Sequence, residues 1–148
     1  FENNVIVLNG HCGVEVRDDG DASLKNNDIS RNGHMGLLFY NGAGGLIQGN
    51  EIHHNGMSGV SVMLNGVPRL IGNYIYSNLH CGLLFNHGGK GLVQGNHVHA
   101  NTLVGVRIES QAHPLVVGNS IFNGLHHGMC VCEAGRGTIQ GNSILHNR

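Results

Sequence analysis

The sequence predicts an all-β protein, a right-handed parallel β-helix of about six coils with three short strands each. Two observations carry this prediction. The pattern Asn-x-Ile/Val-x-x-Asn returns every 23 residues without an insertion, and short runs within each repeat alternate apolar with polar residues. A strict period of about 20 to 50 residues indicates stacked repeats, and the alternation indicates strands. The leading asparagines are Asn4, Asn27, Asn50, Asn73, Asn96, Asn119 and Asn142.

Each repeat contains three runs whose aliphatic side chains fall on one side of an expected strand. The columns are Ile6, Ile29, Ile52, Ile75, Val98, Ile121 and Ile144 in the first run, Val14 to Met129 and Val16 to Val131 in the second, and Leu24, Ile47, Leu70, Val93, Val116 and Ile139 in the third. Three inward columns predict three strands around an apolar core. A leucine-rich repeat is excluded because its Leu-x-x-Leu-x-Leu spacing is missing, and a propeller blade needs about twice as many residues.

Asparagine and glycine recur where the coil must turn, and both tolerate left-handed backbone conformations. Stacked strands lie about 4.8 Å apart, so the asparagines of one column can hydrogen-bond side chain to side chain along the axis. The second asparagine of the pattern is replaced once, by Gly124. We therefore expect a structural role, and no substrate contact, for Asn27, Asn50, Asn73, Asn96, Asn119 and Asn142.

Alternate coils differ at the start of the third strand. Pro68 and Pro114 open it in two coils, and Gly45, Gly91 and Gly137 hold the same place in three others. A proline is tolerated there because a strand's first residue can lack a donor. Residues 1–148 are expected to form a single β-helix domain, and because neither end carries a capping repeat, we expect a fragment of a longer chain.

Composition limits the partners. Charged residues make up 11% of the chain and the net charge is −1, so no basic surface favours nucleic acid, and no run is apolar enough for a membrane. Cys12 and Cys81 share a column three coils apart, while Cys130 and Cys132 are neighbours on one strand. Neither pair is placed for an ordinary disulfide, and unpaired thiols favour a reducing compartment, cytoplasmic or nuclear.

The acidic residues give a weak case for catalysis. Asp18, Asp19 and Asp21 share a turn and could hold calcium through oxygen ligands, although a solvated acidic turn is the simpler interpretation. Glycosidases need two carboxyl groups about 5 to 10 Å apart on one face, and the columns supply no such pair. We expect no enzyme activity, no catalytic residue and no cofactor.

The outward face of the first strands is predicted to carry one polar and aromatic patch, because its members occupy neighbouring positions of adjacent coils. Two imidazoles at His97 and His99 could share a zinc ion, but no third ligand stands at a fixed spacing. A contact surface is the better interpretation, since tyrosine and histidine combine an apolar body with a polar tip. The patch comprises Glu51, His53, Tyr74, Tyr76, His97, His99 and Phe122.

The outward face of the second strands is predicted to expose an apolar stripe of Leu38, Tyr40, Met63 and Leu84. A contiguous exposed apolar surface indicates a partner or another part of the protein that covers it.

A Gly-Val/Leu-x-Val/Phe run, a third strand entered by proline or glycine, and Gly-Asn-x-Ile-x-x-Asn recur in Gly59–Val62, Pro68–Asn78, Gly82–Phe85 and Gly88–Asn96. Through these residues the chain resembles the β-helix repeats of carbohydrate-binding proteins and sugar hydrolases, and more closely those of F-box-only proteins of the 10 and 11 kind. The second resemblance implies the substrate-recognition part of a ubiquitin ligase subunit.

The leading expectation is thus a protein-binding scaffold whose lateral faces hold a protein partner. The alternatives are a carbohydrate-binding or polysaccharide-cleaving domain, with Asp18, Asp19 and Asp21 as its site, and an architectural rod within a large assembly.

Overall fold

The computed structural model describes all residues, 1–148, and contains 19 strands in three parallel sheets. The first sheet holds β1 (Val5–Val7), β4 (Asp28–Ser30), β7 (Glu51–His53), β10 (Tyr74–Tyr76), β13 (His97–His99), β16 (Ser120–Phe122) and β19 (Ser143–Leu145). The second holds β2 (Val14–Val16), β5 (Leu37–Phe39), β8 (Val60–Val62), β11 (Leu83–Phe85), β14 (Val106–Ile108) and β17 (Met129–Val131). The third holds β3 (Asp21–Lys25), β6 (Gly44–Gln48), β9 (Val67–Ile71), β12 (Leu92–Gln94), β15 (Leu115–Val117) and β18 (Thr138–Gln140).

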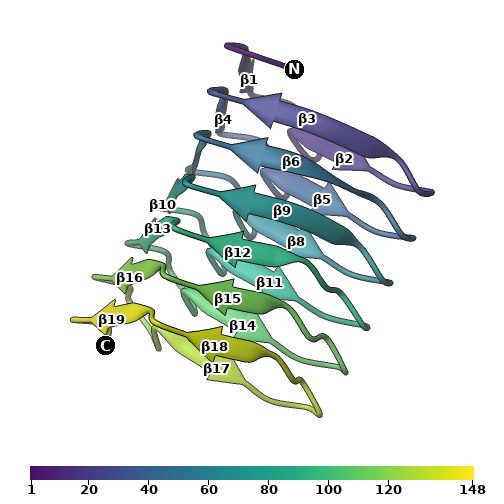
Figure 1. Cartoon of the computed structure of the whole chain (residues 1–148). Helices are drawn as coiled ribbons and strands as arrows, with labels where there is room; N and C mark the ends of the chain where they lie inside the picture. The colour runs from purple at the N-terminus through teal and green to yellow at the C-terminus, as the bar shows by residue number, and fades with distance from the viewer.

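The coils stack in strict register, with the two termini at opposite ends of the rod (Figure 1). Ile6 pairs with Ile29, Ile75 with Val98 and Ile121 with Ile144, each with the residue 23 positions on. The predicted fold class, the period and the three strands per coil are confirmed. No helix long and apolar enough to cross a lipid bilayer occurs in the structure.

The core is the predicted set of inward columns. Ile29, Ile52, Leu70 and Val93 are completely buried, as are the large rings of Phe39 and Phe85. In the last coil the inward residues Ile139 and Ile144 are 43% and 44% exposed, since no further coil of this chain covers them. Burial therefore comes from stacking, as expected for a solenoid.

The backbone conformation at the corners differs from what was expected of the asparagines. The ladder asparagines do not adopt left-handed conformations; the residue immediately before each of them does. In one coil these preceding residues are Gly49, with φ of 65°, and His54, with φ of 53°. The reason is that the asparagine side chain must reach along the axis to bond the next coil, while its predecessor turns the chain.

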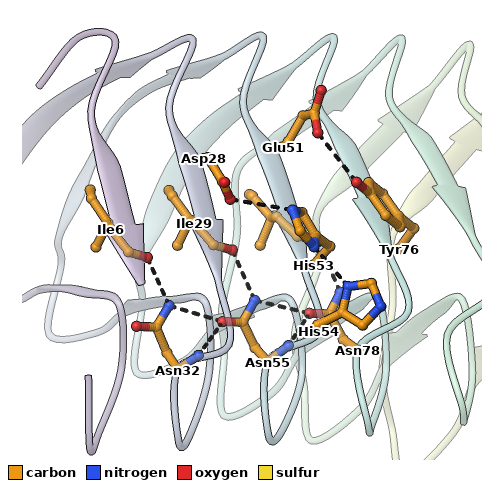
Figure 2. A network of polar contacts seen from close by, with 11 residues as sticks. Ile6, Asp28, Ile29, Asn32, Glu51, His53, His54, Asn55, Tyr76 and Asn78 are labelled. Carbon is orange, nitrogen blue, oxygen red and sulfur yellow. Dashed lines mark hydrogen bonds and ion pairs between the residues drawn. The ribbon is translucent and has the colours of Figure 1, made fainter. Parts of the chain in front are cut away.

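Two hydrogen-bonded columns result, and we call them the asparagine ladders. The first is Asn4, Asn27, Asn50, Asn73, Asn96, Asn119 and Asn142, and the second is Asn9, Asn32, Asn55, Asn78 and Asn101, followed by Gly124 and Asn147. In each step between two asparagines, the carboxamide oxygen of the later one accepts both the backbone N–H and the Nδ2–H of the asparagine one coil before, as Asn73 Oδ1 does from Asn50 at 3.0 Å and 3.0 Å. Nδ2 also donates to a carbonyl 26 residues earlier, for example from Asn55 to Ile29 (Figure 2).

Candidate functional site

The outward face of the first sheet carries a column of stacked rings that runs parallel to the axis. His53 stacks on Tyr76 with centroids 4.7 Å apart and planes 8° apart, and Tyr76 stacks on His99 at 4.9 Å and 2°. His99 then stacks on Phe122 at 4.9 Å and 16°. We call these four residues the ring ladder. Beside it, Tyr74 stacks on His97 at 4.8 Å and 8°.

This stacking follows from the register. Parallel in-register strands place equivalent side chains about 4.8 Å apart, a distance at which planar rings on adjacent coils lie face to face. The face of each ring packs against a neighbouring ring, so the ring edges and polar tips point away from the sheet. The sequence predicted the patch and its members; the face-to-face arrangement is what the structure adds.

Two carboxylates flank the N-terminal end of the ring ladder (Figure 2). Tyr76 donates its phenol proton to Glu51 Oε2 at 3.2 Å. Asp28 Oδ1 lies 3.2 Å from His53 Nε2. Asp28 belongs to β4, one coil before His53, and was not among the residues predicted for the patch.

A second histidine completes a chain of contacts. His54, in the corner after β7, places its Nδ1 at 2.7 Å from His53 Nδ1. Asp28 Oδ1 is buried and without a hydrogen-bond partner, and its 3.2 Å approach to His53 Nε2 favours a proton on that nitrogen. His53 Nδ1 is then the acceptor and His54 Nδ1 the donor, because a neutral imidazole carries one proton. This tautomer leaves His54 Nε2 as an acceptor.

Burial favours the neutral forms of three rings of this face, those of His53, Tyr76 and His99. Burial lowers the pKa of His53, and it outweighs the opposing charge of Asp28. Burial, with the nearby His97, also lowers the pKa of His99. Burial and then the charge of Glu51 raise the pKa of Tyr76. His53, Tyr76 and His99 therefore present neutral donors and acceptors, next to the carboxylates of Asp28 and Glu51.

A family profile described as "Right handed beta helix region" matches residues 12–148. The chain belongs to the right-handed β-helix family. No curated protein matches this β-helix. Among solved structures it is similar to the one titled "Crystal Structure of the periplasmic alginate epimerase AlgG", with a TM-score of 0.81 and 16% identity over 97% of this chain.

That likeness concerns the fold, and the β-helix spans 39% of the epimerase chain. The resemblance to F-box-only proteins receives no support from these matches, which agree instead with the broader resemblance to β-helix repeats.

The apolar stripe of the second sheet is less exposed than predicted. Leu38, Tyr40, Met63 and Leu84 are all half-buried, because each is covered by the equivalent side chains of the coils before and after it. Tyr40 also donates its phenol proton to Glu15 Oε1 at 2.7 Å. Ser61 lies between Leu38 and Leu84 in the register of the sheet, and a partner surface here stays a prediction.

The acidic turn does not converge on one point. Asp18 accepts a hydrogen bond from Asn41 Nδ2 at 3.0 Å and lies 3.6 Å from Arg17 Nε. Asp19 and Asp21 line a different feature, a hollow of about 340 Å³ that Arg69 also borders. The acidic and thiol groups that do converge are Glu109, Cys132 and Glu133. Calcium binding by the aspartates stays a prediction.

Proposed function

We propose that this β-helix binds a polysaccharide, laid along the outward face of the first sheet with the ring ladder as its principal contact. The observation that carries the proposal is the row of ring edges, stacked at 4.7 to 4.9 Å along the axis. A linear polymer of sugar units offers hydroxyl groups at regular intervals, and a face that repeats at every coil can meet several of them.

The chemistry of the face suits sugar hydroxyls. Each hydroxyl can both donate and accept a hydrogen bond, and this face supplies phenol groups, neutral imidazole nitrogens and two carboxylates. Tyr74 is 48% exposed, and its phenol extends the strip beside the ring ladder. Similarity to an alginate epimerase, a protein that by its title acts on a polysaccharide, supports the ligand class.

We propose binding without chemical conversion. Asp28 and Glu51 are each engaged by a neighbouring ring, at 3.2 Å from His53 and 3.2 Å from Tyr76 respectively. A pair of acids free to serve as proton donor and base is what hydrolysis of a glycosidic bond requires.

The test compares the hydroxyl groups of two tyrosines, one on the first sheet and one on the second. Tyr76→Phe keeps the stacked ring and removes the hydroxyl from the ring ladder, and Tyr40→Phe removes the hydroxyl bonded to Glu15 on the second sheet. Calorimetric titration with an uncharged and a uronate polysaccharide should show about fivefold weaker binding for Tyr76→Phe, from the loss of roughly 1 kcal/mol. Tyr40→Phe should bind as the unmodified chain does.

Equal affinity of the two variants, or no binding of either polymer by the unmodified chain, would remove the proposal. Shortening of the polymer during the titration would show that the strip is catalytic.

A second candidate is protein binding by the second sheet, as in the predicted scaffold of an intracellular F-box-type ubiquitin ligase subunit. The half-buried apolar side chains of Leu38, Tyr40, Met63 and Leu84 on one face favour it. Replacing Leu38 and Leu84 by serine should abolish capture of a protein partner and leave polysaccharide binding unchanged.

A further inference from the structure

A cluster of thiols and carboxylates lies at the C-terminal end of the second sheet, away from the ring ladder. Glu109 follows β14, Cys130 lies within β17, and Cys132 and Glu133 follow β17, at the end of the rod where the chain terminates (Figure 1). One ligand atom from each of Glu109, Cys132 and Glu133 lies within 4.8 Å of the others. The Cys132 Sγ donates toward Glu109 Oε2 at 3.9 Å.

The stacked coils bring the cluster together. Cys132 stands 23 residues after Glu109 and therefore occupies the same outward column one coil on. Cys130 points to the same side as Cys132, because residues two apart on a strand share a face.

Charge in the cluster is incompletely balanced. Arg107 bonds to Glu109 through Nε and lies 3.7 Å from Glu133 through Nη2. One guanidinium faces two carboxylates, so the net charge is −1 with both thiols protonated. A divalent cation that displaces one thiol proton brings the sum to zero: three negative charges, from two carboxylates and one thiolate, meet three positive charges.

An unpaired acceptor stands next to the cluster. Asn86 occupies the same column one coil before Glu109, is 9% exposed, and its Oδ1 is buried with no hydrogen-bond partner. Buried polar atoms without a partner are uncommon. A water bound to a cation at Glu109 would have an acceptor on the neighbouring coil.

We propose that Glu109, Cys132 and Glu133 form a binding site for a divalent cation of the zinc type, with water in the remaining position. Mixed sulfur and oxygen ligands suit zinc and its neighbours among the transition metals, whereas calcium and magnesium prefer oxygen alone. Binding forms a metal–sulfur bond at Cys132 and releases the proton of that thiol to solvent, with no change of oxidation state.

The test is a titration of the reduced, purified chain with cobalt(II), followed by displacement with zinc(II). A thiolate–cobalt charge-transfer band should appear at one equivalent, with release of a proton. Cys132→Ser should abolish the band and weaken zinc binding about tenfold or more, and Glu133→Gln should weaken it to a comparable extent. Arg107→Gln should strengthen binding, because it frees both carboxylates.

The chain provides its own controls. Cys12→Ser removes a thiol at the opposite end of the rod and should leave the band unchanged. Cys81 is fully buried, and burial raises its pKa to about 11, so it does not compete for metal. Cobalt binding without a thiolate band would assign the metal to some of the 12 histidines and overturn the proposal. Absence of binding at micromolar metal, or a band retained in Cys132→Ser, would also overturn it.

Discussion

The two asparagine ladders flank the same sheet and use the same bonds, yet one is continuous and the other is interrupted. In the first ladder Asn73 Nδ2 donates to both Ile47 O and Asn96 Oδ1, each at 2.9 Å. In the second, Asn101 Nδ2 donates to Ile75 O at 3.0 Å, and the next coil offers Gly124 in place of a carboxamide. The comparison shows that each coil's corner is stabilised by the side chain of the following coil.

The largest effect is expected from Asn73→Ala, which breaks the continuous ladder at its centre. The substitution removes the acceptor for two buried donors of Asn50 and a donor for Ile47 O and Asn96 Oδ1. Unsatisfied buried groups cost about 1 to 3 kcal/mol each, so we expect a loss of roughly 3 kcal/mol or more in the free energy of unfolding. Urea denaturation measures it, and a loss below about 1 kcal/mol would contradict a structural role.

Asn101→Ala should cost less, about 2 kcal/mol, since the side chain of Asn101 makes one hydrogen bond fewer than that of Asn73. It still accepts from Asn78 through both the backbone N–H and Nδ2, at 3.1 Å and 3.0 Å. The same denaturation experiment should rank the two variants, and a cost equal to that of Asn73→Ala would show that the missing bond has no energetic weight.

Repair of the interruption should stabilise the rod. Gly124 does not have a left-handed φ, and its backbone N–H already donates to Asn147 Oδ1 at 2.9 Å. Gly124→Asn supplies the missing carboxamide, and we expect a gain of about 1 kcal/mol, seen as a higher Tm. Gly124→Ala is the matched control, because its Cβ would sit 2.9 Å from Asn147 Oδ1 without adding hydrogen bonds. A Tm raised equally by both would assign the gain to the backbone.

The smallest expected effect concerns the ring ladder, which titrates whereas the amide ladders do not. The folded-state pKa values of His53 and His99 lie below the ordinary value of about 6.5. As pH falls through this window the unfolded chain binds more protons than the folded chain, so stability is complete above about pH 6.5 and declines below it. His99→Phe keeps a stacked ring and removes one titrating group, so its Tm should fall less between pH 7 and pH 5. An equal decline would place the acid sensitivity elsewhere.

The sequence predicted what the period controls. A spacing of 23 residues determines which residues share a column, and the columns of Ile29, Leu70 and Val93 are buried as expected. It also placed Tyr76 beside His99. Side-chain direction is the part that the period leaves open, and it decides how the rings stack and how far Leu38 and Leu84 are covered.

Two groupings of polar side chains were missed for the same reason. Asp28 approaches His53 from the preceding coil, and Glu133 approaches Glu109 from a turn. In each contact the two residues lie on adjacent coils and do not occupy equivalent positions of the repeat. A search of each outward strand by itself does not pair them; alignment of all residues that are 23 to 25 positions apart would have found both.

The most direct test of the polysaccharide face is the behaviour of individual histidine rings. Proton–carbon NMR spectra of the imidazoles, recorded during a titration with polysaccharide, distinguish the ring-bearing face from the corner where His11 meets His34 at 5.0 Å. The account predicts shifts for His53, His97 and His99 and unchanged signals for His11 and His34. Shifts confined to His11 and His34, or none at saturating polymer, would contradict it.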